Sequence, residues 1–367
     1  MLETSLIIEK TDIEFFIKKI IDSDAISIDI EFMRRNTFFP EPCVIQLSNG
    51  NLHACIDLTL SVDYKTLFKS IFKEDKKIIL HSCRQDLEIL YMILGYIPQN
   101  IFDTQFAASF LGFKYQIGYA ELIKEIYNID IDKTEKMTNW KKRPLSQKQI
   151  NYALNDVKHL NKLCKYLTDK LIETKKIDYF SEEFTNYLDD IDWNPNTNDA
   201  WKKIKAINNL NKKTREIAQI LSIWREEKAI DKNIPRNWIM TEKEIIEISK
   251  NYKSRKKISL HNKNIDCKEI YKIIEKNICL DIKNYSEKNE KLYSSNYKKI
   301  ADDLYDYYKL VSLKNNISYQ IVSPKKMIIN YLKNKDDKSR LINGWRKKII
   351  DINKISKITN PLFNPDQ

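Results

Sequence analysis

Residues 25–31 read Ala-Ile-Ser-Ile-Asp-Ile-Glu, an apolar and β-branched stretch that ends in two carboxylates. This composition predicts a strand, and side chains two apart on a strand point the same way, so Asp29 and Glu31 project together. Two anions on a mostly buried strand repel each other and lose hydration. A divalent cation would compensate both effects, since hard cations take carboxylate oxygens. A D-x-E pattern also fits an acidic strand end that faces water, so the rest of the chain must decide.

The chain around this strand predicts a domain in which strands and helices alternate. The Asn49-Gly50 turn between two apolar runs is a hairpin signal, and Gly95 suits the C-terminal cap of a helix. A hairpin followed by alternating strands and helices predicts an α/β fold with a mixed sheet and helices on its faces. We expect strands at 5–8, 25–31, 43–48, 52–57, 77–82 and 101–103, and helices at 11–21, 64–72, 84–94, 104–111, 119–127 and 146–172.

Three further polar residues follow in an order that suits one site. Asp86 lies in the first turn of the helix after a buried strand, where an open α/β sheet places its ligands. Tyr152 and Asp156 are four apart on the last helix of the domain, so they share a face. Each has an ordinary alternative: a carboxylate favoured by the helix dipole, or a half-buried helix face. The ordered combination with the D-x-E strand favours a single acidic site.

Length and composition indicate a globular protein. A chain of 367 residues suffices for two or three domains, and a hydrophobic content of 42% argues against disorder. No run reaches the roughly 18 apolar residues of a membrane span, and the N-terminus shows no secretory pattern. The cysteines form no C-x-x-C pair, which argues against a zinc site or a disulfide scaffold and favours a reducing, cytoplasmic setting. They are Cys43, Cys55, Cys83, Cys164, Cys267 and Cys279.

The second half of the chain has a different texture. Residues 178–200 are acidic and rich in turn formers, which predicts a linker or docking segment, and helical patterns then continue to the end. Two helical modules, about 202–285 and 290–363, are expected on either side of the polar stretch 283–296. Basic and acidic residues balance up to residue 172, so the whole net charge of +12 lies beyond it. Such a tract suits a polyanion, although a solvated Lys- and Asn-rich sequence is the alternative.

These features together resemble the DEDD-type 3′→5′ exonucleases of the tyrosine subclass, and within them the ribonuclease D family. Its nuclease motifs are matched by Ile28 to Phe32, Arg34, Thr37 to Pro40, Val44 to Leu47, His81, Asp86 to Glu88, Asp103 to Gln105, Lys133, Glu135, Thr138 to Trp140, Arg143 to Leu145, Gln149, Tyr152, Ala153, Asp156 and Val157. Its two HRDC modules are matched by Trp224, Arg225, Lys228, Ala229 and Pro235, and by Leu341 to Arg346. The likeness is thin from 250 to 335. Ile30 and Asn139 stand where the family usually has Thr and Asp.

The resemblance implies a fold class and a division of the chain. The fold class is α/β, a ribonuclease H-like mixed-sheet exonuclease domain followed by all-α HRDC-like helical domains. The exonuclease domain is expected at 1–175 and a linker at 176–200. The helical domains are expected at 201–285 and, in divergent form, at 290–367.

The resemblance also implies a reaction and its cofactors. Two divalent ions, Mg²⁺ or Mn²⁺, would support hydrolysis of phosphodiesters to 5′-mononucleotides from a 3′ end. Asp29, Glu31 and Asp156 would hold the ion that activates water, Asp29 would bridge to the second ion, and Asp86 would hold that ion mostly through waters. Tyr152 would orient the attacking water. The expected partner is RNA with a free 3′ end, above all tRNA precursors, and the protein is expected to be a monomer that needs no membrane.

Residues near the acidic set are candidates for contacts with nucleic acid. Aromatic rings often hold the bases of single-stranded ends, and basic side chains hold phosphates. Core packing and a solvated basic run are the alternatives. The candidates are Phe38, Phe39 and Trp140 for bases, and Lys141, Lys142 and Arg143 for phosphates.

Four other residues are expected to support the structure. His81 and Asp103 both lie at strand ends, and we expect a packed or hydrogen-bonded histidine and a carboxylate that is no metal ligand. Arg225 and Arg346 follow tryptophans, and we expect packing or salt bridges from them rather than contacts with RNA.

Three functions compete at this point. The first is an exonuclease that trims the 3′ ends of structured RNAs. The second is a DNA-directed exonuclease of the same fold, and the third is a catalytically silent scaffold that binds nucleic acid. The helical half is expected to hold the body of the RNA, so removal of 201–367 should weaken binding or processivity but retain the chemistry.

Overall fold

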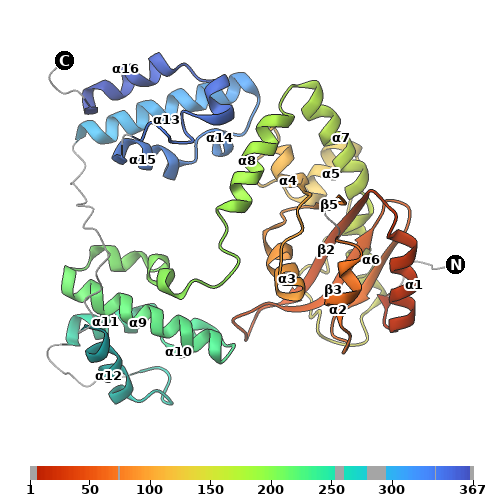
Figure 1. Cartoon of the computed structure of the whole chain (residues 1–367), viewed down its shortest axis with the longest axis horizontal. Coiled ribbons are helices and arrows are strands. Elements are labelled where there is room, and N and C mark those ends of the chain that lie inside the picture. The colour runs from red at the N-terminus through yellow and green to blue at the C-terminus, as the bar shows by residue number, and fades with distance from the viewer. Residues whose placement is uncertain (1–5, 73–74, 253–259, 279–294, 335, 364–367) are drawn as a thin grey trace. The chain divides into compact units, whose positions relative to one another are not determined.

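The computed structural model describes residues 6–72, 75–252, 260–278, 295–334 and 336–363 (Figure 1). The N-terminal region is built on a six-stranded sheet with the order β1-β4-β3-β2-β5-β6. Strand β1 is parallel to β4, β3 is antiparallel to β4, and β5 is parallel to both β2 and β6, so the sheet is mixed as predicted. The strands are β1 (Leu6–Ile7), β2 (Ala25–Met33), β3 (Glu41–Ser48), β4 (His53–Asp57), β5 (Lys77–Leu80) and β6 (Ile101–Asp103).

The D-x-E strand, β2, lies inside this sheet, between β3 and β5. Ile28 and Ile30 are buried, whereas Asp29 and Glu31 are half-buried. The alternation predicted from the sequence is therefore confirmed, and both carboxylates project from the same side of a buried strand.

Eight helices accompany the sheet in the described residues before 192, among them α6 packed on β4 and α7 on β5. Two have the predicted bounds, α3 with Gly95 as a left-handed cap (φ 83°) and α5 with Asn128 as its left-handed cap. The helices are α1 (Lys10–Ile20), α2 (Tyr64–Lys69), α3 (Arg84–Leu94), α4 (Thr104–Ala108), α5 (Tyr119–Tyr127), α6 (Gln147–Lys158), α7 (Leu160–Glu173) and α8 (Ile177–Asp189).

The single helix predicted over 146–172 is wrong, because the structure divides it at His159 into α6 and α7. The Tyr119 hydroxyl donates a hydrogen bond to the Asn155 carbonyl and accepts one from the His159 N–H, at 3.1 and 3.3 Å. It thus stands between the two groups that an unbroken helix would bond to each other, and a group inserted in this way breaks a helix.

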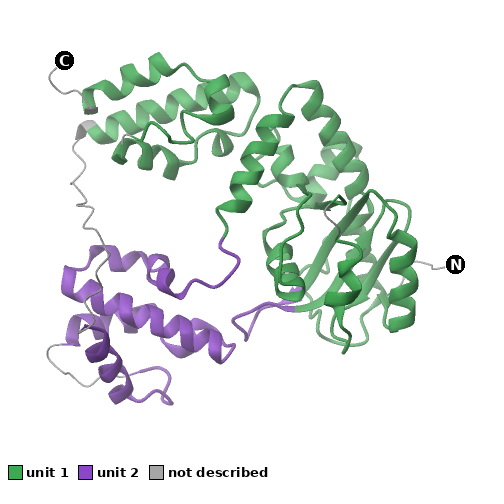
Figure 2. Cartoon of the chain, viewed as in Figure 1, with its two compact units in different colours: residues 1–31, 42–191, 290–367 green, residues 32–41, 192–289 purple. Residues whose placement is uncertain are grey.

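The chain forms two compact units, coloured green and purple in Figure 2. The first comprises residues 1–31, 42–191 and 290–367, and the second comprises 32–41 and 192–289. Beyond β6 the described residues contain helices and no strand, as predicted. The polar stretch 283–296, which was expected to separate the helical modules, lies almost wholly outside the described residues, as does Cys279.

The prediction of a linker from residue 176 is wrong for the beginning of that range, because α8 occupies it. Phe180 and Phe184 are four apart on α8 and buried, and their rings stack 5.6 Å apart. The rings of Phe106 and Phe110, which follow the last strand of the sheet, have centres within 6.2 Å of the Phe180 ring centre. This apolar face offsets the acidic composition that suggested a linker.

The C-terminal helices of the first unit, here called the second helical module (295–334 and 336–363), dock against α8 and the residues after α4. Trp345 is fully buried, and its ring centre lies 5.5 Å from those of Phe110 and Tyr179. The Ser318 N–H donates to the Ser109 carbonyl at 2.8 Å. Its helices are α13 (Ser295–Asn315), α14 (Tyr319–Val322), α15 (Lys325–Asn334), η4 (Gly344–Lys348) and α16 (Ile352–Phe363).

The second unit has its own apolar core. The core gathers around α9, with Leu221 fully buried and Trp224 nearly so, and the unit also includes the connection between β2 and β3. We call its described helical region, 197–252 and 260–278, the first helical module. Its helices are η1 (Thr197–Lys203), η2 (Lys205–Asn209), α9 (Lys212–Asp231), α10 (Arg236–Ile239), α11 (Glu242–Asn251) and α12 (Cys267–Ile278).

No helix among the described residues combines the length and the apolar character that crossing a bilayer requires.

Candidate active site

The structure brings together the acidic residues that the sequence singled out. Carboxylate oxygens of Asp29 and Glu31 on β2 and of Asp156 on α6 all lie within 4.8 Å of one another. Asp86, in the first turn of α3, is 7% exposed and accepts a hydrogen bond from the Ile30 N–H of β2. Three of the acids thus form a close trio, and Asp86 lies near enough to interact electrostatically with Asp29 and Glu31 of β2.

Burial raises the pKa of all four carboxyl groups, and repulsion by neighbouring carboxylates adds to the effect at Asp29, Glu31 and Asp86. Burial, with Asp156 nearby, raises the pKa of Asp29 to about 7. Burial, with Asp29 and Asp156 nearby, raises the pKa of Glu31 to about 9. The pKa values of Asp86 and Asp156 are also raised, chiefly by burial. The negative charge of the four carboxylates is therefore incompletely compensated within the protein, and their all-carboxylate donor set fits hard divalent cations such as Mg²⁺ or Mn²⁺.

Tyr152 joins the cluster through Asp156. Its hydroxyl donates a hydrogen bond to the Asp156 carboxylate, one helical turn further along α6. The Trp140 ring lies 5.9 Å from the Tyr152 ring and is 1% exposed, so it supports the tyrosine from behind. Burial, with Asp156 next to it, raises the pKa of the Tyr152 hydroxyl, which keeps its proton at neutral pH.

Lys133 supplies positive charge to the cluster, and sequence reasoning noted it only as one residue of a motif. Its Nζ lies 3.0 Å from Oδ1 of Asp156, and 5.3 and 5.6 Å from the ring centres of Tyr119 and Tyr152. Its charge opposes the effect of burial on three of the four carboxyl groups. Lys133 lies in an irregular segment before α6, so no local sequence pattern predicts this contact.

The turn that carries Asp86 is held by Asp103. The Asp103 carboxylate accepts hydrogen bonds from the N–H groups of Ser82 and Cys83, at 3.1 and 2.8 Å, and from the first turn of α4. Ser82 has φ 64°, so the chain turns sharply between β5 and α3. His81 bonds to the Thr104 hydroxyl and the Ile117 carbonyl, at 2.9 and 3.0 Å. Both residues thus support the structure, as predicted.

Three of the six candidates for contacts with nucleic acid are engaged within the protein. Phe38 is 4% exposed in the core of the second unit, and Trp140 is buried as well, so neither offers an open face to a base. Arg143 donates to the Asp57 carboxylate and to the Cys43 and Trp140 carbonyls. Core packing and a buried ion pair thus explain these three residues. Phe39 is half-buried, and Lys141 and Lys142 are exposed.

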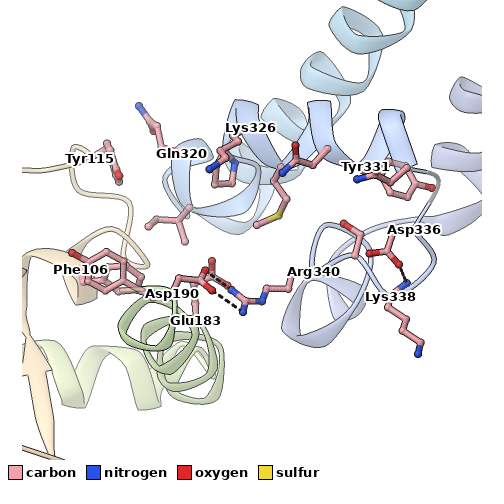
Figure 3. Close-up of a pocket in the computed structure, with 17 residues that line it drawn as sticks. Phe106, Tyr115, Glu183, Asp190, Gln320, Lys326, Tyr331, Asp336, Lys338 and Arg340 are labelled. Carbon is pink, nitrogen blue, oxygen red and sulfur yellow. Dashed lines mark hydrogen bonds and ion pairs between the residues drawn. The ribbon is translucent and has the colours of Figure 1, made fainter. Parts of the chain in front are cut away.

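A separate pocket of about 610 Å³ lies between α8 and the second helical module (Figure 3). Tyr115 and Lys326 are among the residues that line it, and Asp190 and Arg340 form an ion pair at its side. The pocket shares no residue with the acidic cluster, so it is not the place where the four carboxylates meet.

The mixed sheet and the carboxylates at the end of β2 define a 3′-5′ exonuclease domain. A family model described as 3′-5′ exonuclease matches residues 6–172, which contain the whole cluster. The chain is 32% identical over 360 residues to ribonuclease D of Bartonella henselae, covering 94% of this chain and 87% of that protein. The chain belongs to the ribonuclease D family, and it is a 3′-5′ exonuclease of the hydrolase class.

Other relatives agree with this placement. Ribonuclease D of Desulfotalea psychrophila is 33% identical over 252 residues, 68% of this chain and 67% of that protein. The crystal structure of RNase D of Escherichia coli matches with a TM-score of 0.83 at 23% identity, over 96% of this chain and 97% of that one. The catalytic core of RRP6 from Trypanosoma brucei matches with a TM-score of 0.58 at 17% identity, over 76% of this chain and 80% of that one. These structures show a shared fold that includes the helical region.

Proposed function

We propose that this protein is an exoribonuclease that releases 5′-mononucleotides from the 3′ ends of RNA with the help of two divalent metal ions. The observation that carries the proposal is the convergence of four buried or half-buried carboxylates beside a tyrosine hydroxyl. The names of the relatives support RNA as the substrate, and the Escherichia coli protein is described as an exoribonuclease involved in structured RNA processing.

The side chains would divide the work as follows. Asp29, Glu31 and Asp156 form the close trio and would hold one ion, while Asp86 together with Asp29 would hold the other. The ions, Mg²⁺ or Mn²⁺, would supply Lewis acidity and lower the pKa of bound water. Tyr152 retains its proton and would orient the attacking water by hydrogen bonding rather than accept a proton from it. Attack at the terminal phosphorus breaks the bond to the 3′ oxygen, which leaves a shortened RNA and a 5′-mononucleotide.

Contacts beyond the reaction centre would determine the choice of substrate. Lys141 and Lys142 are exposed and lie before α6, and Phe39 is half-buried at the edge of the core that contains Phe38. We assign phosphate contacts to the lysines and a base contact to Phe39. The net charge of +12 beyond residue 172 would attract the body of a structured RNA, with tRNA precursors as the expected class. A cytoplasmic location and a monomeric state stay predictions.

The test compares two substrates on the full-length protein with Mn²⁺. A 5′-labelled tRNA precursor with a short 3′ extension should shorten one nucleotide at a time, faster than a single-stranded DNA of the same length. Asp29→Asn should abolish the shortening and still bind the RNA. Faster digestion of the DNA would overturn the RNA assignment in favour of a DNA exonuclease. RNA binding without release of any nucleotide by the unaltered protein would show a silent scaffold.

A further inference from the structure

The strand that carries the metal-binding pair continues directly into the second unit. Strand β2 ends at Met33, two residues beyond Glu31, and residues 32–41 cluster with the first helical module rather than with the sheet. The connection 34–40, which leads from β2 to β3, is therefore held by helices that lie more than 150 residues later in the sequence. Its anchoring can be followed contact by contact.

Asn233 holds the backbone of this connection. Its side-chain Oδ1 accepts hydrogen bonds from the N–H groups of both Phe38 and Phe39, at 3.1 and 3.0 Å. Asn233 follows the end of α9 with φ 47°, and the Ile234 N–H next to it donates to the Ala229 carbonyl. Asparagine tolerates this left-handed conformation better than most residues, so the backbone of Asn233 ends the helix while its side chain binds the connection.

Phe38 fixes the same connection by its ring. The ring is 4% exposed in a core that includes Trp224 and Ile239. The Arg236 guanidinium lies 4.4 Å from the ring centre, and Glu226, whose side chain is 1% exposed, holds that guanidinium through both carboxylate oxygens. A buried ring under an ion-paired arginine leaves the tip of the connection little freedom.

The connection is also ordered internally. The Arg34 Nε donates to the Phe38 carbonyl at 3.0 Å, and the Thr37 hydroxyl donates to the Phe39 carbonyl at 2.6 Å. Between Glu31 and the anchored Phe38 there are six residues, of which the first two still belong to β2. Only a short, internally hydrogen-bonded stretch of chain therefore separates the anchored Phe38 from Glu31.

We propose that the first helical module positions the metal-binding end of β2, with Asn233 as the positioning residue. The module would then contribute to the geometry of the reaction centre, in addition to any contact it makes with RNA. Carboxylates bind two metal ions well only when their positions are fixed to within a fraction of an ångström. Loss of a residue that holds a metal ligand in place typically changes the metal affinity by about 10–100-fold. This inference rests on the proposed function only in the experiment that measures enzymatic activity.

Three full-length variants test this inference. Asn233→Gly removes the acceptor and suits the left-handed backbone, Asn233→Asp keeps the acceptor, and Asn128→Gly changes another left-handed asparagine at the end of α5. Asn233→Gly should speed hydrogen exchange in 32–41, weaken Mn²⁺ binding measured by calorimetry about tenfold, and lower kcat more than it raises KM. Asn233→Asp and Asn128→Gly should leave all three measurements near those of the unaltered protein.

The outcomes separate this inference from the proposed function. Faster exchange in 32–41 with unchanged Mn²⁺ affinity would show that the connection is only a tether, which overturns the inference. Unchanged exchange in the Asn233→Gly variant would show that this side chain is not the anchor. A protein that binds Mn²⁺ but hydrolyses no RNA would refute the proposed function, and the exchange and calorimetric measurements would still decide the role of Asn233.

Discussion

At the scale of single residues, protons and metal ions compete for the same oxygens. Asp29 and Glu31 have pKa values raised to about 7 and about 9, against ordinary values of about 4 for both residue types. Between about pH 4 and pH 9, the metal-free folded protein therefore binds more protons at these two residues than the unfolded chain does. Its stability from this source is complete below about pH 4 and is lost as the pH rises through 7 and 9.

We predict that the melting temperature of the metal-free protein falls between pH 5 and pH 9 and that Mn²⁺ counteracts the fall. The ion replaces the protons, so its affinity should rise by about tenfold or more from pH 6 to pH 8. Thermal melts in EDTA and in Mn²⁺ across this range provide the measurement. The double variant Asp29→Asn/Glu31→Gln should flatten the dependence, and an equally steep fall in that variant would contradict the assignment.

Tyr152 carries a second prediction at this scale. Tyr152→Phe keeps the ring that packs on Trp140 but removes the hydroxyl bonded to Asp156. We expect kcat to fall about a hundredfold with little change in Mn²⁺ affinity, since loss of a group that orients a reactant acts on the chemical step. Single-turnover assays measure this, with Tyr127→Phe as the matched control. A loss of metal binding equal to the loss of rate would instead make Tyr152 a member of the ion site.

The sequence predicted the four acids and Tyr152 because each lies in a local pattern: a strand end, a first helical turn, and one helix face. Lys133 and Asn233 follow no such pattern. Lys133 comes near Asp156 only through the folded path of an irregular segment, and Asn233 meets Phe38 across 195 residues. Phe38 illustrates the same limit, since a ring that stacks on bases and a ring in a core have the same sequence signature.

At the scale of elements, Arg143 fastens the segment before α6 to the sheet. It bonds to the carboxylate of Asp57 at the end of β4, to the Cys43 carbonyl on β3, and to the Trp140 carbonyl. Against the effect of burial, the hydrogen bonds from Arg143 and Thr59 and the charge of Arg143 hold the pKa of Asp57 below its ordinary value. The arginine thus holds Trp140 in place, and the Trp140 ring in turn packs against Tyr152.

We predict that Arg143→Ala lowers the free energy of unfolding by about 3 kcal/mol, because Asp57, with a side chain 3% exposed, loses its cationic partner. Urea denaturation measures this. Lys142→Ala, at the exposed neighbouring position, should stay within about 0.5 kcal/mol of the unaltered protein. If Arg143→Ala weakened RNA binding and left stability unchanged, the phosphate contact considered from the sequence would be the better explanation.

The bounds of elements followed from the sequence where their end signals are local. The predicted bounds of α3 and α5 are confirmed, and Gly95 caps α3 as expected. The break at His159 was missed because its cause, the Tyr119 hydroxyl, comes from another helix. Helix α8 was missed because its acidic residues outweighed the Phe180 and Phe184 pair in the composition.

At the scale of the whole molecule, two ion pairs join α8 or its end to the second helical module. Glu183 accepts hydrogen bonds from Arg346 at 2.7 Å and from the Trp345 ring N–H at 2.8 Å, with the Arg346 side chain 1% exposed. The pair of Asp190 with Arg340 is open to solvent, at 63% and 43% exposed. A buried pair stabilises its surroundings only while both partners are present.

We therefore predict unequal effects from two similar substitutions. Glu183→Gln should lower the free energy of unfolding by about 3 kcal/mol, because it leaves the buried Arg346 charge unpaired. Asp190→Asn should lower it by at most about 1 kcal/mol. Limited proteolysis should release the second helical module faster from the Glu183→Gln protein. Equal proteolysis of the two variants would show that the apolar contacts of Trp345 alone hold the module in place.

The same contacts bear on the deletion of 201–367 that the sequence suggested as a test. Such a chain loses Trp345, which covers Phe110 and Tyr179, and it loses Asn233, which binds Phe38. Its defects would combine folding with any loss of RNA binding. The single substitutions above separate these effects, and they are the sharper test of what the helical half contributes.

The contact of Asn316 with Leu111 joins residues 205 apart in the sequence. During translation at about 5–20 residues per second, the nuclease region emerges from the ribosome roughly 10–40 seconds before the helices that complete it. Throughout that interval the aromatic surface later covered by Trp345 is bare on the nascent chain. Ribosome-associated chaperones that bind aromatic segments would bind the nascent chain at this surface first. Slower translation would lengthen the time for which the surface is available to them.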